Sequence, residues 1–258
     1  MQNVKCITSK AHKNKNSKMM ADNNISIDVR VQEDLETNLG KIQILNAEID
    51  IILDEIKNGL EKKKNLIGTR REKPQIRYLN LLEDPIQLNI NLKCKTFLFV
   101  FRQFISKYFR ALYQSKQILG YEKVANVLPD LSVNGSTKKI INLLKGTYDF
   151  DKDIIDTIQE GGDFLIISRL LRNSIKTYAV LITHTVYEGE NANFYLNFPL
   201  DEETKDDTLL FVKEKLIKMD ETSNFTVKVG FFDNCQVYAK RLFEILIDKL
   251  DSKGVFYN

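Results

Sequence analysis

The chain has 258 residues, of which 43% are hydrophobic and 28% are charged, and its formal net charge is +3. This composition indicates a folded globular protein, and the small net charge excludes an overall field strong enough to impose binding to nucleic acid or to a membrane. Cys6, Cys94 and Cys235 are odd in number and far apart. They argue against a disulfide framework and favour an intracellular protein of the cytoplasm or nucleus.

Residues 1–27 are predicted to form a disordered basic tail, because scattered lysines are mixed with many polar residues. The tail has no apolar stretch long enough for a signal peptide. No later segment approaches the roughly 20 apolar residues of a membrane-spanning helix, so no membrane partner is expected. Asn, Ser and His separate the lysines between Lys10 and Lys18, which suits a solvated tail better than a nuclear-import or nucleic-acid signal.

An apolar heptad repeat between Val31 and Leu60 predicts a coiled-coil helix over residues 31–64. Two positions in seven form its seam, which suits one facing helix of a partner protein or of a second copy. We therefore expect this helix to lie outside the core of the following domain, so that Ile49→Asp would abolish association and leave that domain folded. The predicted partner-binding residues are Leu35, Ile42, Leu45, Ile49, Ile52 and Ile56.

A junction from Ile67 to Pro74 should end this helix, since Pro74 cannot continue it. The junction is the most basic part of the chain. Contacts of phosphates with its charges and with the segment Lys10–Lys18 would make the protein a nucleic-acid-associated factor, which is the alternative function. Lysines at a helix C-terminus followed by a solvated linker explain the same pattern without a ligand. The basic residues are Lys62, Lys63, Lys64, Arg70, Arg71 and Lys73.

Residues 74–258 are predicted to form one α+β globular domain. Residues 86–100 place large apolar side chains on both faces of an extended segment, which predicts a buried strand. Aromatic residues at helical spacing then predict a helix over 101–112. Two short helices are expected at Thr137–Lys145 and Asp151–Glu160, and glycines close both.

The C-terminal third predicts a β-hairpin formed by Tyr178–Tyr187 and Phe194–Phe198. A helix is expected over Asp201–Met219, an alternating strand over Phe225–Phe231, and a last helix that stops before Gly254. This order of elements predicts an α+β fold, in which an N-terminal coiled-coil helix precedes a mixed-sheet domain flanked by helices.

Four acidic residues, Asp149, Asp151, Asp153 and Glu160, imitate the ligand spacing of an EF-hand calcium loop. The sixth position of that loop must turn sharply on glycine, and here it is Ile154. The dipole of the following helix favours acidic residues in its first turn without any metal. We therefore predict no metal site.

A catalytic constellation is not evident. His184 lies in phase with the apolar face of a predicted strand, which favours a buried structural histidine over a general base. Neither Cys94 nor Cys235 has a recognised nucleophile context, so no catalytic residue and no cofactor are predicted. The predicted function is a non-enzymatic assembly or scaffold subunit that oligomerises or docks through its coiled coil and presents an α+β protein-interaction domain.

Overall fold

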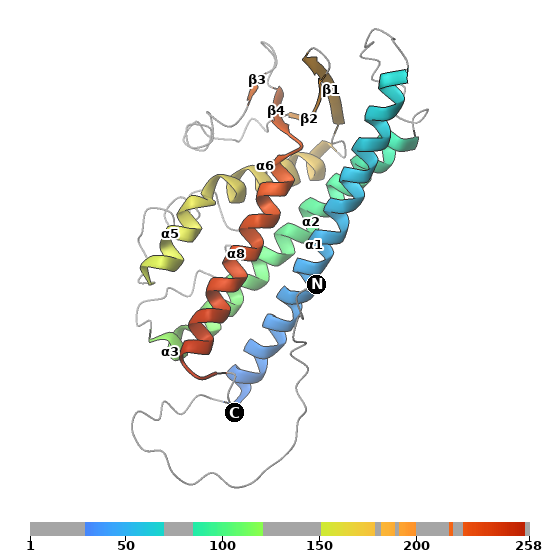
Figure 1. Cartoon of the computed structure of the whole chain (residues 1–258). Helices are drawn as coiled ribbons and strands as arrows, with labels where there is room; N and C mark the ends of the chain where they lie inside the picture. The colour runs from blue at the N-terminus through green and yellow to red at the C-terminus, as the bar shows by residue number, and fades with distance from the viewer. Residues whose placement is uncertain are drawn as a thin grey trace, which may run out of the picture.

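The structure is a computed structural model that describes residues 29–69, 85–120, 151–178, 182–188, 191–199, 217–218 and 224–255. Two long helices, α1 (Val29–Thr69) and α2 (Pro85–Gln114), run antiparallel, and the C-terminal helix α8 (Phe231–Ser252) packs against both (Figure 1). The remaining helices are α3 (Lys116–Leu119), α5 (Lys152–Glu160) and α6 (Gly162–Tyr178). The expected helix Thr137–Lys145 and the basic tail lie outside the described residues.

The heptad seam of α1 lies in the core of the protein. All six seam residues are buried, from Leu35 at 0% exposed to Ile52 at 8%. They belong to the same hydrophobic cluster as the buried residues of α2, α5, α6 and α8. The narrow apolar stripe that the sequence shows is therefore covered by helices of the same chain.

Helix α2 includes residues 86–100, which are helical and not extended as we expected. Pro85 begins the helix, where its fixed φ is favourable and its missing N–H costs nothing. The helix packs against α1, α6 and α8, so most of its circumference is apolar. The Phe97 ring lies with its centroid 6.2 Å from Phe101 and 4.6 Å from Phe232 of α8.

Polar contacts set the register of the helices around α1. Asn38, which is only 6% exposed, donates from Nδ2 to Oε1 of Gln114 at 2.7 Å and joins the start of α1 to the end of α2. Asp50 contacts α8, where Lys240 Nζ lies 2.9 Å from its carboxylate and Gln236 donates a hydrogen bond to it. A buried polar group in an apolar seam specifies one alignment, because other alignments leave it unpaired.

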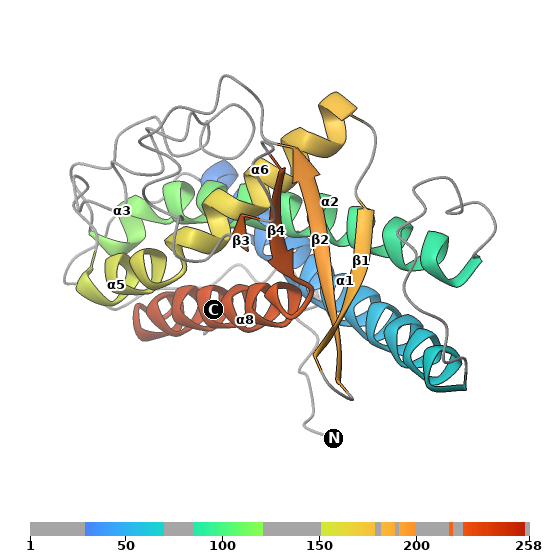
Figure 2. The same cartoon turned by 90° about the horizontal axis from the view of Figure 1, so that it is seen from above.

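A small antiparallel sheet packs against α2 and α6 (Figure 2). Its strands lie in the order β1-β2-β4-β3, and every pairing is antiparallel. The first two strands form a hairpin in which Thr185 lies opposite Phe194. The strands are β1 (Ile182–Glu188), β2 (Asn191–Pro199), β3 (Ile217–Lys218) and β4 (Asn224–Lys228).

The α+β prediction, with its mixed-sheet domain flanked by helices, is wrong. Within the described residues the buried hydrophobic side chains lie in helices, apart from Leu196 and Val229. The expected helix Asp201–Met219 lies mostly outside these residues, and its described positions 217–218 are a strand. Phe231 begins α8 and does not end a strand. The protein is built on a helical core, because residues 86–100, which were expected to form a buried strand, belong to helix α2.

Candidate docking surface on α1

The predicted partner-binding residues do not form a surface. Ile42, Ile49 and Ile56 are each 1% exposed or less and face the chain's own core. A seam of a and d positions is equally suited to a neighbouring helix of the same chain and to a partner helix. Only the other faces of α1 are therefore available to a partner.

The opposite face of α1 carries two exposed isoleucines. Ile44 and Ile51 are each 61% exposed, and seven residues of an α-helix bring a side chain back to nearly the same direction. Ala47 between them is exposed, and a Cβ atom placed on Gly40 would meet no atom within 4 Å. These four residues, the outer stripe, have the spacing of a second heptad seam.

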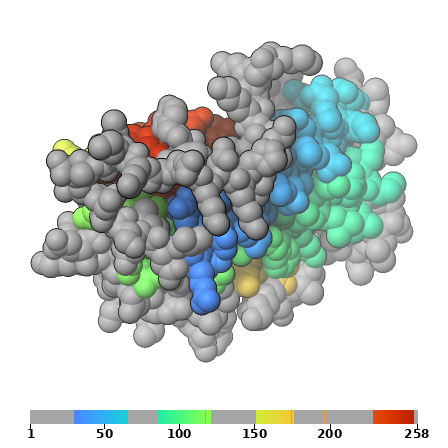
Figure 3. All heavy atoms as spheres, turned by 90° about the horizontal axis from the view of Figure 1, so that it is seen from below, coloured from blue at the N-terminus to red at the C-terminus, as the bar shows by residue number. Residues whose placement is uncertain are grey.

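Three residues of the outer stripe, Ile44, Ala47 and Ile51, are exposed. Figure 3 shows part of α1, in blue, at the surface next to α2, in green. Small residues at Gly40 and Ala47 allow the backbone of a second helix to approach closely, and the two isoleucines offer apolar area to it. The stripe thus has the shape and chemistry of a seam for a partner helix.

Charged residues on both flanks of the outer stripe are mainly acidic. Glu36 and Asp54 are exposed on one flank, and Glu48 is exposed on the other flank together with Lys41. Glu55 is on the same flank as Glu48 and contacts Lys93 of α2 at 2.6 Å. A helix that lies on the stripe therefore meets an apolar strip bordered mostly by negative charge, which favours basic residues on the flanks of the partner.

Exposed apolar side chains also lie on α8 and on α2, where Leu88, Leu92 and Phe99 share one side of the helix. Leu88, Leu92 and Phe99 on α2 are exposed by 37%, 51% and 44%, less than the isoleucines of the outer stripe. Val237 on α8 is 63% exposed, and it stands alone among the large apolar side chains exposed on that helix. Single exposed apolar residues are normal on a protein surface. Val237 therefore serves as a control position.

The basic junction is only partly described. Lys62, Lys63 and Lys64 lie in the last turns of α1, where Lys62 and Lys64 are exposed. Arg70, Arg71 and Lys73 lie outside the described residues. The alternative role in nucleic-acid binding stays a prediction.

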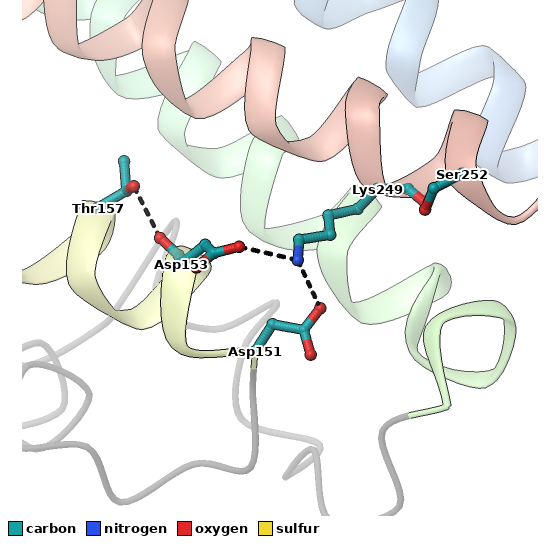
Figure 4. Close-up of polar contacts among 5 residues, drawn as sticks. All are labelled: Asp151, Asp153, Thr157, Lys249 and Ser252. Atoms are coloured by element: carbon teal, nitrogen blue, oxygen red, sulfur yellow. Dashed lines mark hydrogen bonds and ion pairs between the residues drawn. The ribbon is translucent and has the colours of Figure 1, made fainter.

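The calcium-like segment is engaged in ion pairs. Nζ of Lys249 lies 3.1 Å from a carboxylate oxygen of Asp151 and 3.0 Å from one of Asp153 (Figure 4). The hydrogen bonds that Lys249 donates to Asp153 and Asp151 raise the pKa of Lys249 above its usual value of 10.5. In the described part of the chain, no three His, Cys, Asp or Glu side chains are grouped closely enough to hold a metal ion.

Calcium titration should give no saturable binding to this segment below about 1 mM, the weak end for such loops. The physical reason is that Lys249 of α8 already pairs with Asp151 and Asp153, and that Ile154 lies in the first turn of α5 where a calcium loop needs glycine. Isothermal titration calorimetry measures this directly. A saturable heat that disappears in Asp153→Asn would contradict the expectation.

Both described cysteines are poor nucleophiles. Cys94 and Cys235 are fully buried free thiols. Burial raises the pKa of Cys94, and burial together with the nearby Asp163 raises the pKa of Cys235. A thiol must ionise to react, so neither resembles an activated catalytic cysteine.

His184 lies in β1, where its backbone is opposite Tyr195. Its side chain is outside the described part of the chain.

The signal for the outer stripe was present in the sequence, since Ile44 and Ile51 are one heptad apart. The sequence analysis did not identify it because the larger seam of α1 accounted for the repeat.

Comparison of the chain with protein-family models, curated proteins and solved structures found no match. None of the helices within the described residues is long and apolar enough to cross a membrane.

Proposed function

We propose that the protein is a non-enzymatic assembly subunit that docks a basic amphipathic helix of a partner protein onto the outer stripe of α1. The observation that carries the proposal is the pair of isoleucines, Ile44 and Ile51, each 61% exposed in the middle of a helix whose opposite face is in the core. Leaving two large apolar side chains in water has no benefit for the fold itself. An exposed apolar strip bordered by charges is typical of an interaction surface.

The chemistry of the partner follows from the flanks of the stripe. Glu36, Glu48 and Asp54 are exposed acids beside the apolar residues, and only Lys41 opposes them there. A partner helix with Lys or Arg on both sides of an apolar seam would complement this charge, whereas an acidic helix would be repelled. The free buried thiols Cys94 and Cys235 suit an intracellular setting, which we include in the proposal.

Peptide binding tests the proposal. The probe is a synthetic helix of about three heptads with Leu at its a and d positions and Lys at its e and g positions. It should bind the full chain, and added salt should weaken the binding because exposed charges are screened. A peptide with Glu in place of every Lys should not bind. Fluorescence anisotropy of the labelled peptides measures both affinities.

The variant Ile44→Asp/Ile51→Asp separates apolar docking from general attraction between charges. It makes α1 more acidic, so purely electrostatic binding of the basic peptide would become stronger. Docking on the stripe loses the burial of two isoleucines, roughly 3 kcal/mol or more, and should weaken more than about a hundredfold. Val237→Asp, on the exposed face of α8, is the matched control and should bind like the wild type.

Two outcomes would overturn the proposal. One is equal binding of the basic peptide by the wild type and by the double variant. The other is a wild-type dimer in light scattering that Ile44→Asp dissociates, since the occupant of the stripe would then be a second copy of the chain.

A further inference from the structure

Three arginines gather where α2 meets α6. Arg102 is a buried residue of α2, and Arg169 and Arg172 are three residues apart on α6, which places them on the same side of that helix. The two helices pack against each other (Figure 2). Both α6 arginines act electrostatically on Arg102. Three positive charges therefore lie close together, and that of Arg102 is almost completely buried.

Hydrogen bonds do not compensate these charges. Arg102 is only 8% exposed, and its Nη1 atom is buried without a hydrogen-bond partner. Nη1 of Arg169, on the other helix, is also buried and unpaired. The ion pairs between described residues include none of the three arginines. A buried guanidinium normally pairs with an anion, because its desolvation is otherwise uncompensated.

The positive charge persists at neutral pH. Burial, with the neighbouring Arg169 and Arg172, lowers the pKa of Arg102 to about 10. Burial and Arg172 also lower the pKa of Arg169. With a pKa of about 10, Arg102 keeps its positive charge at pH 7. An anion at the two buried Nη1 atoms would balance this charge.

We propose that Arg102, Arg169 and Arg172 form a binding site for the phosphate group of a small molecule. Guanidinium groups bind phosphate and carboxylate through paired N–H donors. A phosphate monoester carries close to two negative charges at neutral pH and a carboxylate only one, so phosphate matches three arginines better. The nearly complete burial of Arg102 excludes the surface of a membrane or a nucleic-acid duplex, which cannot enter between two packed helices.

Such a ligand would join α6 to α2. The two buried donors without a partner belong to different helices. They are Nη1 of Arg102 on α2 and Nη1 of Arg169 on α6. Binding would therefore replace repulsion between the helices by a shared contact, and it would stabilise the folded chain in proportion to ligand concentration. This inference does not depend on the outer stripe of α1.

Thermal unfolding and calorimetry of the full chain test the site. The probes are inorganic phosphate and adenosine monophosphate, with sodium chloride at matched ionic strength as the reference. Phosphate should raise the unfolding temperature in a saturable way and chloride should not. A larger effect of the nucleotide would mean that the ligand carries its phosphate on an organic group, and equal effects would identify free phosphate.

Variants locate the binding. Arg102→Met should weaken phosphate binding at least about tenfold, and it should unfold at the same or a higher temperature than the wild type without phosphate, because a buried unpaired charge is removed. Arg169→Gln/Arg172→Gln, at half-buried positions, should lose the response as well. Arg110→Gln, exposed on α2, is the matched control and should keep it.

The proposal is overturned if phosphate and chloride shift the wild type equally. It is also overturned if Arg110→Gln loses the response as much as Arg102→Met does, since the effect would then come from the general basic surface. Should Arg102→Met fail to fold, the double variant on α6 decides the question by itself.

Discussion

Replacing Ile49 by Asp is expected to unfold the chain, whereas replacing Ile51 by Asp should hardly change its stability. The two isoleucines are two residues apart on α1, but Ile49 is 1% exposed and Ile51 is 61% exposed. A carboxylate at position 49 would be buried in the apolar core without a partner and should cost more than about 4 kcal/mol. That is a large part of the total stability of a domain, which is about 5–15 kcal/mol.

Urea denaturation followed by circular dichroism measures both variants. Ile51→Asp should stay within about 0.5 kcal/mol of the wild type, as for most surface substitutions. Unfolding of Ile49→Asp would replace the expectation from the sequence, in which this substitution abolishes association and leaves the domain of residues 74–258 folded. A cooperative, near wild-type transition of Ile49→Asp would show that α1 is not part of the core.

Adding one methyl group at Gly161 is the second change with a large expected effect. Gly161 lies between α5 and α6 with φ of −100° and ψ of 12°, a conformation open to any residue. A Cβ atom there would lie only 2.0 Å from Cε2 of Tyr238. The Tyr238 ring is buried and packs at 5.7 Å from the ring of Phe164, so it cannot simply turn away.

Gly161→Ala should therefore destabilise the protein by about 1–3 kcal/mol through overpacking. Gly40→Ala is the matched control, because a Cβ there meets open space within a helix. It should stabilise the protein by about 0.5–1 kcal/mol, since alanine loses less backbone entropy than glycine in a helix. Thermal unfolding of the two variants separates the effects, and equal behaviour would exclude a close approach of Tyr238.

The first helix could be predicted from its sequence, but its partner could not. The repeat of Ile42, Ile49 and Ile56 identifies a helix with one buried seam, and the structure places that seam in the core. The pattern records which face avoids water and contains no information on the chain that covers it. The contacts that decide this involve residues far away in sequence, such as Gln236, which bonds to Asp50 across 186 positions.

The second helix was misread for a different reason. A helix that is covered on most sides loses the clean 3.6-residue period on which sequence analysis depends. In α2, Phe97 faces α8 and Leu98 is buried as well, so consecutive apolar residues resemble a strand buried on both faces. Pro85 as a favourable first residue of a helix was the available signal.

The arginine cluster could not be foreseen from the sequence. Arg102 follows an apolar run and looks like the exposed side of an amphipathic helix. Only the packing of α6 against α2 brings Arg169 to it and excludes water from both. Sites built from side chains on separate helices depend on tertiary structure, whereas a surface stripe such as Ile44 with Ile51 is local and can be read along one helix.

The pairing of α1 with α8 affects how the protein is made. Part of the seam on α1 is covered by α8, residues 231–252. This helix leaves the ribosome long after α1 and α2 have been synthesised. During that interval the newly made chain exposes core isoleucines and phenylalanines, which is the state in which nascent proteins bind chaperones or aggregate. Folding should also be slow for a helical protein, because its closing contacts are distant in sequence. A chain that stops before Phe231 would keep this seam open and be a ready substrate for proteolytic quality control.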